Sequence, residues 1–66
     1  MPKWKELKRF LERNGEHVRS GKHEIYRYQG REIRVSHSSE EISPDLWRSM
    51  LKKELRITHE EFYAGI

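Results

Sequence analysis

The stretch from residue 17 to residue 36, which reads HVRSGKHEIYRYQGREIRVS, decides the fold. Its β-branched and aromatic residues are divided by two short segments that each contain a glycine, at positions 21 and 30. Short runs rich in β-branched and aromatic residues, separated by segments that contain glycine, are typical of antiparallel strands joined by turns. The stretch therefore predicts three strands, His17 to Arg19, His23 to Tyr28 and Glu32 to Ser36.

The middle strand of this predicted sheet offers apolar surface on both faces. Successive side chains of a strand alternate between the two faces, so Ile25 lies on one face and Tyr26 and Tyr28 lie on the other. In the third strand, Ile33 and Val35 share one face. Two interpretations of the tyrosines stay open, namely stacking on the bases of RNA across an open sheet and packing in the core.

The residues before the strands predict an amphipathic helix from Lys3 to Asn14. Its apolar positions recur at helical spacing, which places them on one face. These positions are Trp4, Leu7, Phe10 and Leu11. Pro2 is suited to the first turn of the helix, and Asn14-Gly15 predicts a left-handed exit at its end.

The residues after the strands predict a second helix and a short terminal helical turn. Ser43-Pro44-Asp45 combines an N-cap oxygen, a first-turn proline and an acid that complements the helix dipole. The apolar stripe that follows consists of Leu46, Trp47, Met50, Leu51 and Leu55. Thr58 to Glu61 has the sequence of a capping box. We expect Phe62 and Tyr63 to anchor the terminal turn that this box opens.

The order of these elements predicts an α+β fold of the type α-β-β-β-α. We expect both helices to pack on one face of a three-stranded antiparallel sheet and to leave the other face open, which antiparallel sheets tolerate. With 66 residues the chain has room for a single domain, spanning residues 1–66. A domain of this size buries only about 60% of the surface that its unfolded chain exposes, so its core is thin.

The charge of the chain is uneven along its length. The formal net charge is +3, yet residues 1–36 hold ten Lys or Arg against five Glu, whereas residues 37–66 hold four against six acids. A surface rich in Lys and Arg attracts polyanions. The basic half is therefore a candidate surface for RNA.

The composition excludes several classes of protein. The chain has no cysteine, so it has neither disulfides nor a thiolate metal site. Its histidines lack the spacing that places two ligands on one face of an element, and we expect no metal and no cofactor. No apolar run approaches the roughly 20 residues of a transmembrane helix, and the first residues lack the apolar region of a signal peptide. We therefore expect a cytoplasmic location and no membrane partner.

The sharpest local feature is Arg19-Ser20-Gly21-Lys22-His23, a glycine turn with two cations and a histidine that opens a strand. Cleavage of RNA without a metal requires a base for the 2′-hydroxyl, an acid for the leaving oxygen and positive charge for the phosphorane. His23 is the candidate catalytic residue because histidine transfers protons near neutral pH. Arg19 and Lys22 supply positive charge, and Gly21 lets backbone donors approach an anion closely. The alternative is an ordinary hairpin turn.

Further residues extend this candidate RNA site. His37, directly after the third strand, is a candidate second acid or base. Arg27 and Arg34 are candidate RNA-binding residues on the strands. Lys52 and Lys53, at the end of the second helix, are suited either to hold phosphates or to complement the helix dipole.

Four stretches of the chain together match the pattern of a known family. They are Gly21-Lys22-His23 with the strand that follows, Ile33 to His37, Glu41 to Lys52 and Ile57 to Phe62. Through these stretches the chain resembles the HicA family of toxins from toxin–antitoxin systems. The resemblance implies a double-stranded-RNA-binding-like fold and a metal-independent endoribonuclease, an mRNA interferase that a HicB-like antitoxin neutralises. It also implies that His23 matches the catalytic histidine of the family.

Two functions of other classes stay open at this point. One is a non-catalytic module that binds RNA on the same scaffold. The other is a protein-interaction domain whose open sheet is covered by a partner, which a thin core makes physically reasonable. Cleavage of RNA in the presence of a chelator distinguishes the enzyme from both.

Overall fold

The computed structural model describes all 66 residues of the chain. Its elements are α1 (Trp4–Asn14), β1 (Glu16–Arg19), β2 (Glu24–Tyr28), β3 (Arg31–Val35), α2 (Pro44–Ser49), the π-helix η1 (Met50–Leu55) and α3 (His59–Ala64). The strands form one antiparallel sheet in the order β1-β2-β3. This order confirms the α+β fold. The predicted ends of the first helix and of the three strands lie within one residue of the observed ends.

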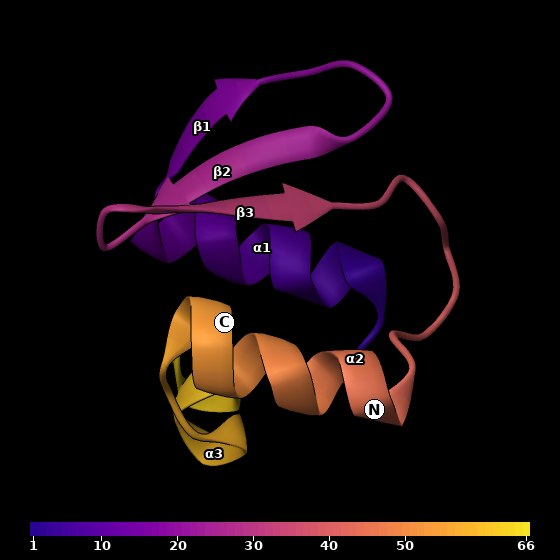
Figure 1. The fold of residues 1–66 in the computed structure, drawn as a ribbon, viewed down its shortest axis with the longest axis vertical. Coiled ribbons are helices and arrows are strands. Elements are labelled where there is room, and N and C mark those ends of the chain that lie inside the picture. The colour runs from indigo at the N-terminus through magenta and orange to yellow at the C-terminus, as the bar shows by residue number, and fades with distance from the viewer.

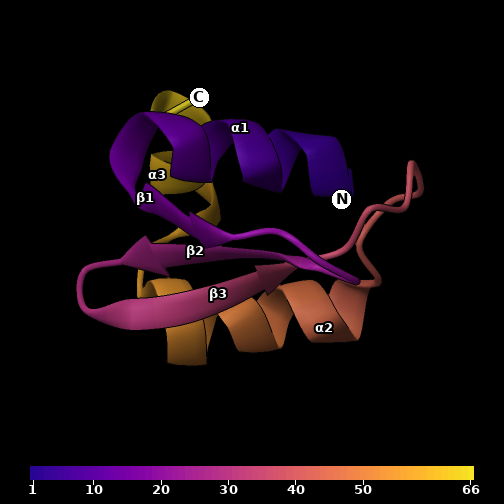
Figure 2. The same ribbon diagram turned by 90° about the horizontal axis from the view of Figure 1, so that it is seen from above.

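The helices share a core with one face of the sheet. In Figure 1, α1 crosses behind the strands and α2 runs alongside β3. The view from above in Figure 2 shows α3 behind α1, and the two helices are in contact, because the side chain of Asn14 donates a hydrogen bond to the carbonyl oxygen of Gly65, directly after α3. Twelve buried hydrophobic residues from the helices, the loop before α2 and the sheet form a single cluster. The opposite face of the sheet carries no buried residue, so it is open.

The tyrosines of β2 belong to the core. Tyr26 and Tyr28 are 1% and 7% exposed, and Tyr26 pairs with the buried Ile33 of β3. Burial, together with the nearby Glu12 and Glu24 carboxylates, raises the pKa of Tyr26 to about 12. The hypothesis that these tyrosines stack on bases across an open sheet is therefore wrong.

Helix α1 ends at its C-cap, Gly15, where the backbone passes so close to β2 that no side chain fits. Gly15 has a φ of −124°, so the left-handed exit predicted from Asn14-Gly15 does not occur. A Cβ atom at Gly15 would lie 2.5 Å from the backbone oxygen of Arg27, so only glycine lets the end of α1 approach β2 this closely. At the other end Lys3 is the N-cap, and Pro2 precedes the helix instead of occupying its first turn.

The turn between β2 and β3 fixes the register of this hairpin. Gln29 and Gly30 have φ values of 50° and 80°. Two consecutive residues with positive φ are the signature of a type I′ turn, whose twist matches that of the flanking strands. The resulting register pairs Ile25 with Arg34, which places both on the open face.

A β-bulge in β1 changes the direction of one cation. His17 pairs with Tyr26, whereas Arg19 pairs with Ile25, so Val18 is an additional residue in β1. Regular alternation would place Arg19 on the same face as His17, which is the helix side of the sheet. The bulge instead places Arg19 on the open face, beside Ile25.

The second helix departs from a regular α-helix after Ser49 and continues as η1. Arg31 of β3 donates hydrogen bonds to the last carbonyls of η1, at Glu54 and Leu55, and its charge complements the helix C-terminus. Leu46, expected in the buried stripe, is 42% exposed. No helix of the chain combines the length and the apolar character needed to cross a bilayer.

Helix α3 completes the core at the C-terminus. Thr58 begins the helix with the predicted capping box. Phe62 is fully buried, and its ring centroid lies 5.0 Å from that of Phe10 and 4.6 Å from that of Trp47. Tyr63 is 43% exposed, so Phe62 is the one buried side chain of this helix, and Nδ1 of His59 accepts a hydrogen bond from the indole of Trp47.

Candidate functional site

The turn between β1 and β2 borders a small hollow on the open face of the sheet. The volume of this hollow is about 200 Å³. It is lined by Arg19, Ser20, Gly21, Lys22, His23, Ile25 and Arg34. Three of these residues carry a positive charge and none is a carboxylate, so the hollow suits an anion. We call it the cationic hollow.

Five of the residues predicted for the RNA site meet in the cationic hollow. They are Arg19, Gly21, Lys22, His23 and Arg34. The bulge at Val18 brings in the arginine of β1, and the register of the β2–β3 hairpin brings in the arginine of β3. The sequence indicated each of these cations separately. The bulge in β1 and the register of the β2–β3 hairpin explain why the two arginines lie on one face of the sheet.

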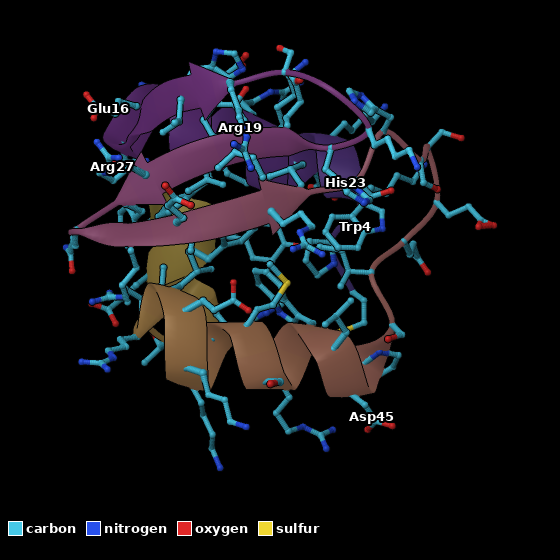
Figure 3. All side chains as sticks on the ribbon, turned by 45° about the horizontal axis from the view of Figure 1, so that its top comes forward. Trp4, Glu16, Arg19, His23, Arg27 and Asp45 are labelled. Carbon is cyan, nitrogen blue, oxygen red and sulfur yellow. The ribbon has the colours of Figure 1, made fainter.

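The charged side chains of the cationic hollow have no partners within the chain. All are exposed, and no hydrogen bond or ion pair engages the side chains of Arg19, Lys22, His23 and Arg34. Figure 3 shows His23 at the end of the sheet where β2 begins, with Arg19 over the open face. An imidazole and three cations are therefore available to a ligand in this hollow.

A carboxylate on the other side of the sheet lies next to the same turn. The side chain of Glu24 is 12% exposed, and its oxygens lie 3.4 Å from Nε2 of His17 and 4.0 Å from Nε2 of His37. A hydrogen bond from Ser20 holds the pKa of the Glu24 carboxyl below its usual range, and the two histidines lower this pKa further. We call these four residues, Glu24, His17, His37 and Ser20, the turn clamp.

The turn clamp also contacts the backbone of the turn. Nε2 of His37 lies 3.0 Å from the carbonyl oxygen of Gly21, which accepts its hydrogen bond. Nε2 of His17 lies 3.2 Å from Oγ of Ser20. No three His, Asp or Glu side chains of the chain converge as a metal-binding set. The contacts thus tie β1, the turn and the segment after β3 together around one carboxylate.

His37 therefore lies against the turn that carries His23, but it does not line the cationic hollow. Sequence reasoning missed the role of Glu24. The available signal was its position directly after His23, at the start of a strand whose alternation places residue 24 on the same side as Tyr26.

The remaining predicted RNA-binding residues lie outside the cationic hollow. Arg27 is on the open face, but its guanidinium pairs with Glu16 at 3.1 Å and with Glu32 at 3.7 Å. Figure 3 shows Arg27 and Glu16 together at the end of the sheet opposite to His23. Lys52 and Lys53 are exposed on η1 and line no hollow.

The fold and the cationic hollow define a small α+β protein with an exposed histidine among cations. A family model described as the HicA toxin of bacterial toxin–antitoxin systems matches residues 4–55, from the start of α1 to the end of η1. The chain therefore belongs to the HicA family, whose toxins pair with antitoxins. Comparison with curated proteins and with solved structures found no match. The family model does not extend to α3, so it does not cover the segment from Ile57 to Phe62, whose sequence resembles the family.

Proposed function

We propose that this toxin is a metal-independent endoribonuclease that cuts messenger RNA, with His23 as an acid or base of the reaction. The observation that carries the proposal is the exposed His23 imidazole in a hollow with three unpaired cations and no carboxylate. A phosphodiester is an anion whose negative charge grows at the phosphorane, so it matches such a lining.

The reaction uses the 2′-hydroxyl of the RNA as its nucleophile. One imidazole removes the 2′-hydroxyl proton while the oxygen attacks the adjacent phosphorus. The bond to the 5′-oxygen then breaks, and this oxygen takes up a proton. The products are a 2′,3′-cyclic phosphate and a free 5′-hydroxyl. Arg19, Lys22 and Arg34 stabilise the phosphorane charge. Gly21 has no side chain and so lets the RNA strand come close to the backbone of the turn.

His37 is our candidate for the second proton-transfer group. It is exposed and contacts the backbone of the turn at Gly21, so a modest rotation of its ring away from the carbonyl would free a nitrogen beside the turn. Arg27, Lys52 and Lys53 are exposed cations that extend the surface for the RNA backbone beyond the hollow. We propose a HicB-like antitoxin as the protein partner.

Induced expression in bacteria tests the proposal. We expect wild type to arrest growth and to shorten transcripts on RNA gels, and His23→Ala to do neither, because loss of an acid–base group costs about 10²- to 10⁴-fold in rate. The matched control is Arg9→Ala, an exposed substitution on α1 that lines no hollow and should leave the arrest intact.

The outcome also separates the alternatives. A folded His23→Ala variant that still arrests growth and shortens transcripts contradicts the role of His23. Wild type that binds RNA and leaves it intact indicates a binding module that uses the same cations. The thermal midpoint of each purified variant shows whether it is folded.

A further inference from the structure

A second and larger hollow adjoins the cationic hollow. It lies between β3 and the helix formed by α2 and η1, and its volume is about 480 Å³. It is lined by Trp4, Arg19, Ile25, Glu32, Arg34, Leu46, Met50 and Glu54. Arg19, Ile25 and Arg34 line both hollows, so the two adjoin at these side chains, and we call the pair the groove.

We propose that the larger hollow binds a nucleobase of the RNA strand, next to the phosphate held in the cationic hollow. We further infer that this base carries an exocyclic amino group, as adenine, cytosine and guanine do. This inference rests on the proposed function only in that both require RNA as the ligand. It adds a site for a base, which the cationic hollow by itself does not provide.

The apolar part of the larger hollow provides a surface for stacking. Trp4 packs against the core and is only partly buried, so part of its indole lies in the hollow. Leu46 is 42% exposed, although it belongs to the apolar stripe of α2, and Met50 lies on the same helix side. Base stacking on aromatic side chains is the main way in which proteins hold single-stranded RNA.

The charges of the groove are divided in a way that suits one nucleotide. Arg19 and Arg34 line both hollows, whereas the carboxylates Glu32 and Glu54 line only the larger one. Carboxylates repel a phosphate, but they accept hydrogen bonds from amino groups on base edges. The phosphate is therefore favoured at the cationic end and an amino-bearing base at the other.

The position of the groove agrees with the proposed chemistry. Figure 3 shows Trp4 and His23 at the same end of the sheet, away from the ion pair of Arg27 with Glu16. A volume of about 480 Å³ lies within the range of roughly 300–1,000 Å³ that is usual for small-molecule sites. A base on Trp4 would thus extend from a phosphate that lies beside His23.

Binding of a short single-stranded RNA in the presence of chelator tests the inference. The protein is the full chain with His23→Gln, which prevents cleavage, and the probe is a fluorescent RNA pentamer. We expect Trp4→Leu, which keeps apolar packing but lacks an aromatic ring, to bind the pentamer about tenfold more weakly, within the range known for base–aromatic stacking. The matched control is Tyr63→Leu, because Tyr63 is an exposed aromatic residue on α3 that lines neither hollow.

The chemistry of the base is tested with the same assay. A pentamer of uridines should bind more weakly than one of cytidines, and Glu54→Gln should reduce this difference. Irradiation of a pentamer that contains 5-iodocytidine should cross-link it to Trp4, as identified by mass spectrometry.

Each outcome decides between the two proposals. Trp4→Leu with an unchanged thermal midpoint and wild-type RNA affinity overturns the base site and leaves the groove for a protein partner. A cross-link at any other residue also contradicts the inference. Loss of affinity in Trp4→Leu, combined with wild type that never cleaves RNA, retains the base site and refutes the nuclease.

Discussion

At the scale of single residues, the arginines of the open face differ in how free they are to bind an anion. Arg34 has no partner, whereas Arg27 pairs with Glu16 and Glu32. An arginine that is already neutralised by carboxylates releases fewer counterions when it meets a phosphate. Equal exposure on one face therefore does not imply an equal role.

We expect Arg34→Ala to weaken RNA binding and to reduce the slope of log affinity against log salt by about 0.7, the contribution of one contact to a single strand. Arg27→Ala should have a smaller effect on both quantities, because its charge is already paired. Fluorescence titrations from low to moderate salt measure the slopes. Equal slopes for wild type and Arg34→Ala would show that this guanidinium does not touch a phosphate.

Glu24 makes the stability of the turn depend on pH. Its pKa is lowered in the folded protein, first by Ser20 and then by the charges of His17, His37 and Lys8. A lowered pKa stabilises the folded state at a pH above the normal carboxyl value, and this contribution disappears as the pH falls through the lowered pKa. We expect Glu24→Gln to be less stable than wild type at pH 5 and to approach it at pH 3. Urea unfolding measures the difference, and a gap that stays constant would contradict the turn clamp.

The sequence was sufficient to identify the part of the cationic hollow that the turn from Arg19 to His23 supplies, because a glycine turn with cations and a histidine is a local pattern. It was insufficient for the directions of the side chains. Arg19 reaches the open face only because Val18 forms a bulge, and a bulge depends on the pairing of two strands. The direction of Tyr26 and Tyr28 could not be predicted either, because the alternation of side chains along a strand does not say which face the helices cover.

At the scale of elements, α3 lies outside the matched family range and yet fills the core. Phe62 contacts the rings of Phe10 and Trp47 and is fully buried. A short helix with one buried anchor depends on that anchor, because a six-residue helix is unstable in water by itself. Helix α3 is thus part of the fold despite its place at the C-terminus.

We expect Phe62→Ala to lower the free energy of unfolding by about 3–5 kcal/mol, the usual cost of removing a buried phenylalanine. For a domain of this size, each kcal/mol lowers the thermal midpoint by about 4–8 °C. Tyr63→Ala is the neighbouring control and should change the midpoint far less, since Tyr63 is 43% exposed. Similar midpoints for Phe62→Ala and wild type would show that α3 does not support the core.

Element boundaries followed closely from periodicity, caps and glycine turns. What periodicity could not predict is the change from α2 to the π-helix η1, because the two helix types share most of their residue preferences. The exposure of Leu46 is a related case. Its spacing is that of a core residue, but the helix lies beside β3 in a way that leaves this side chain at the groove.

At the scale of the whole molecule, folding concentrates unpaired cations on the open face. The hydrophobic cluster lies between the helices and the other face of the sheet. No residue of this cluster lines the cationic hollow, so the core and the candidate site are built from different residues. The open face carries the cationic hollow, and the charged side chains of this hollow are exposed. An antitoxin that covered this face would block the same site and would add stability to a small domain.

The most direct measurement of the central claim is the cleavage of a defined single-stranded RNA by purified protein in excess EDTA. The account predicts that wild type yields fragments that end in a 2′,3′-cyclic phosphate, and that folded His23→Ala cuts at least about 100-fold more slowly. Equal cleavage by both proteins, or cleavage that appears only after a divalent metal is added, would contradict it.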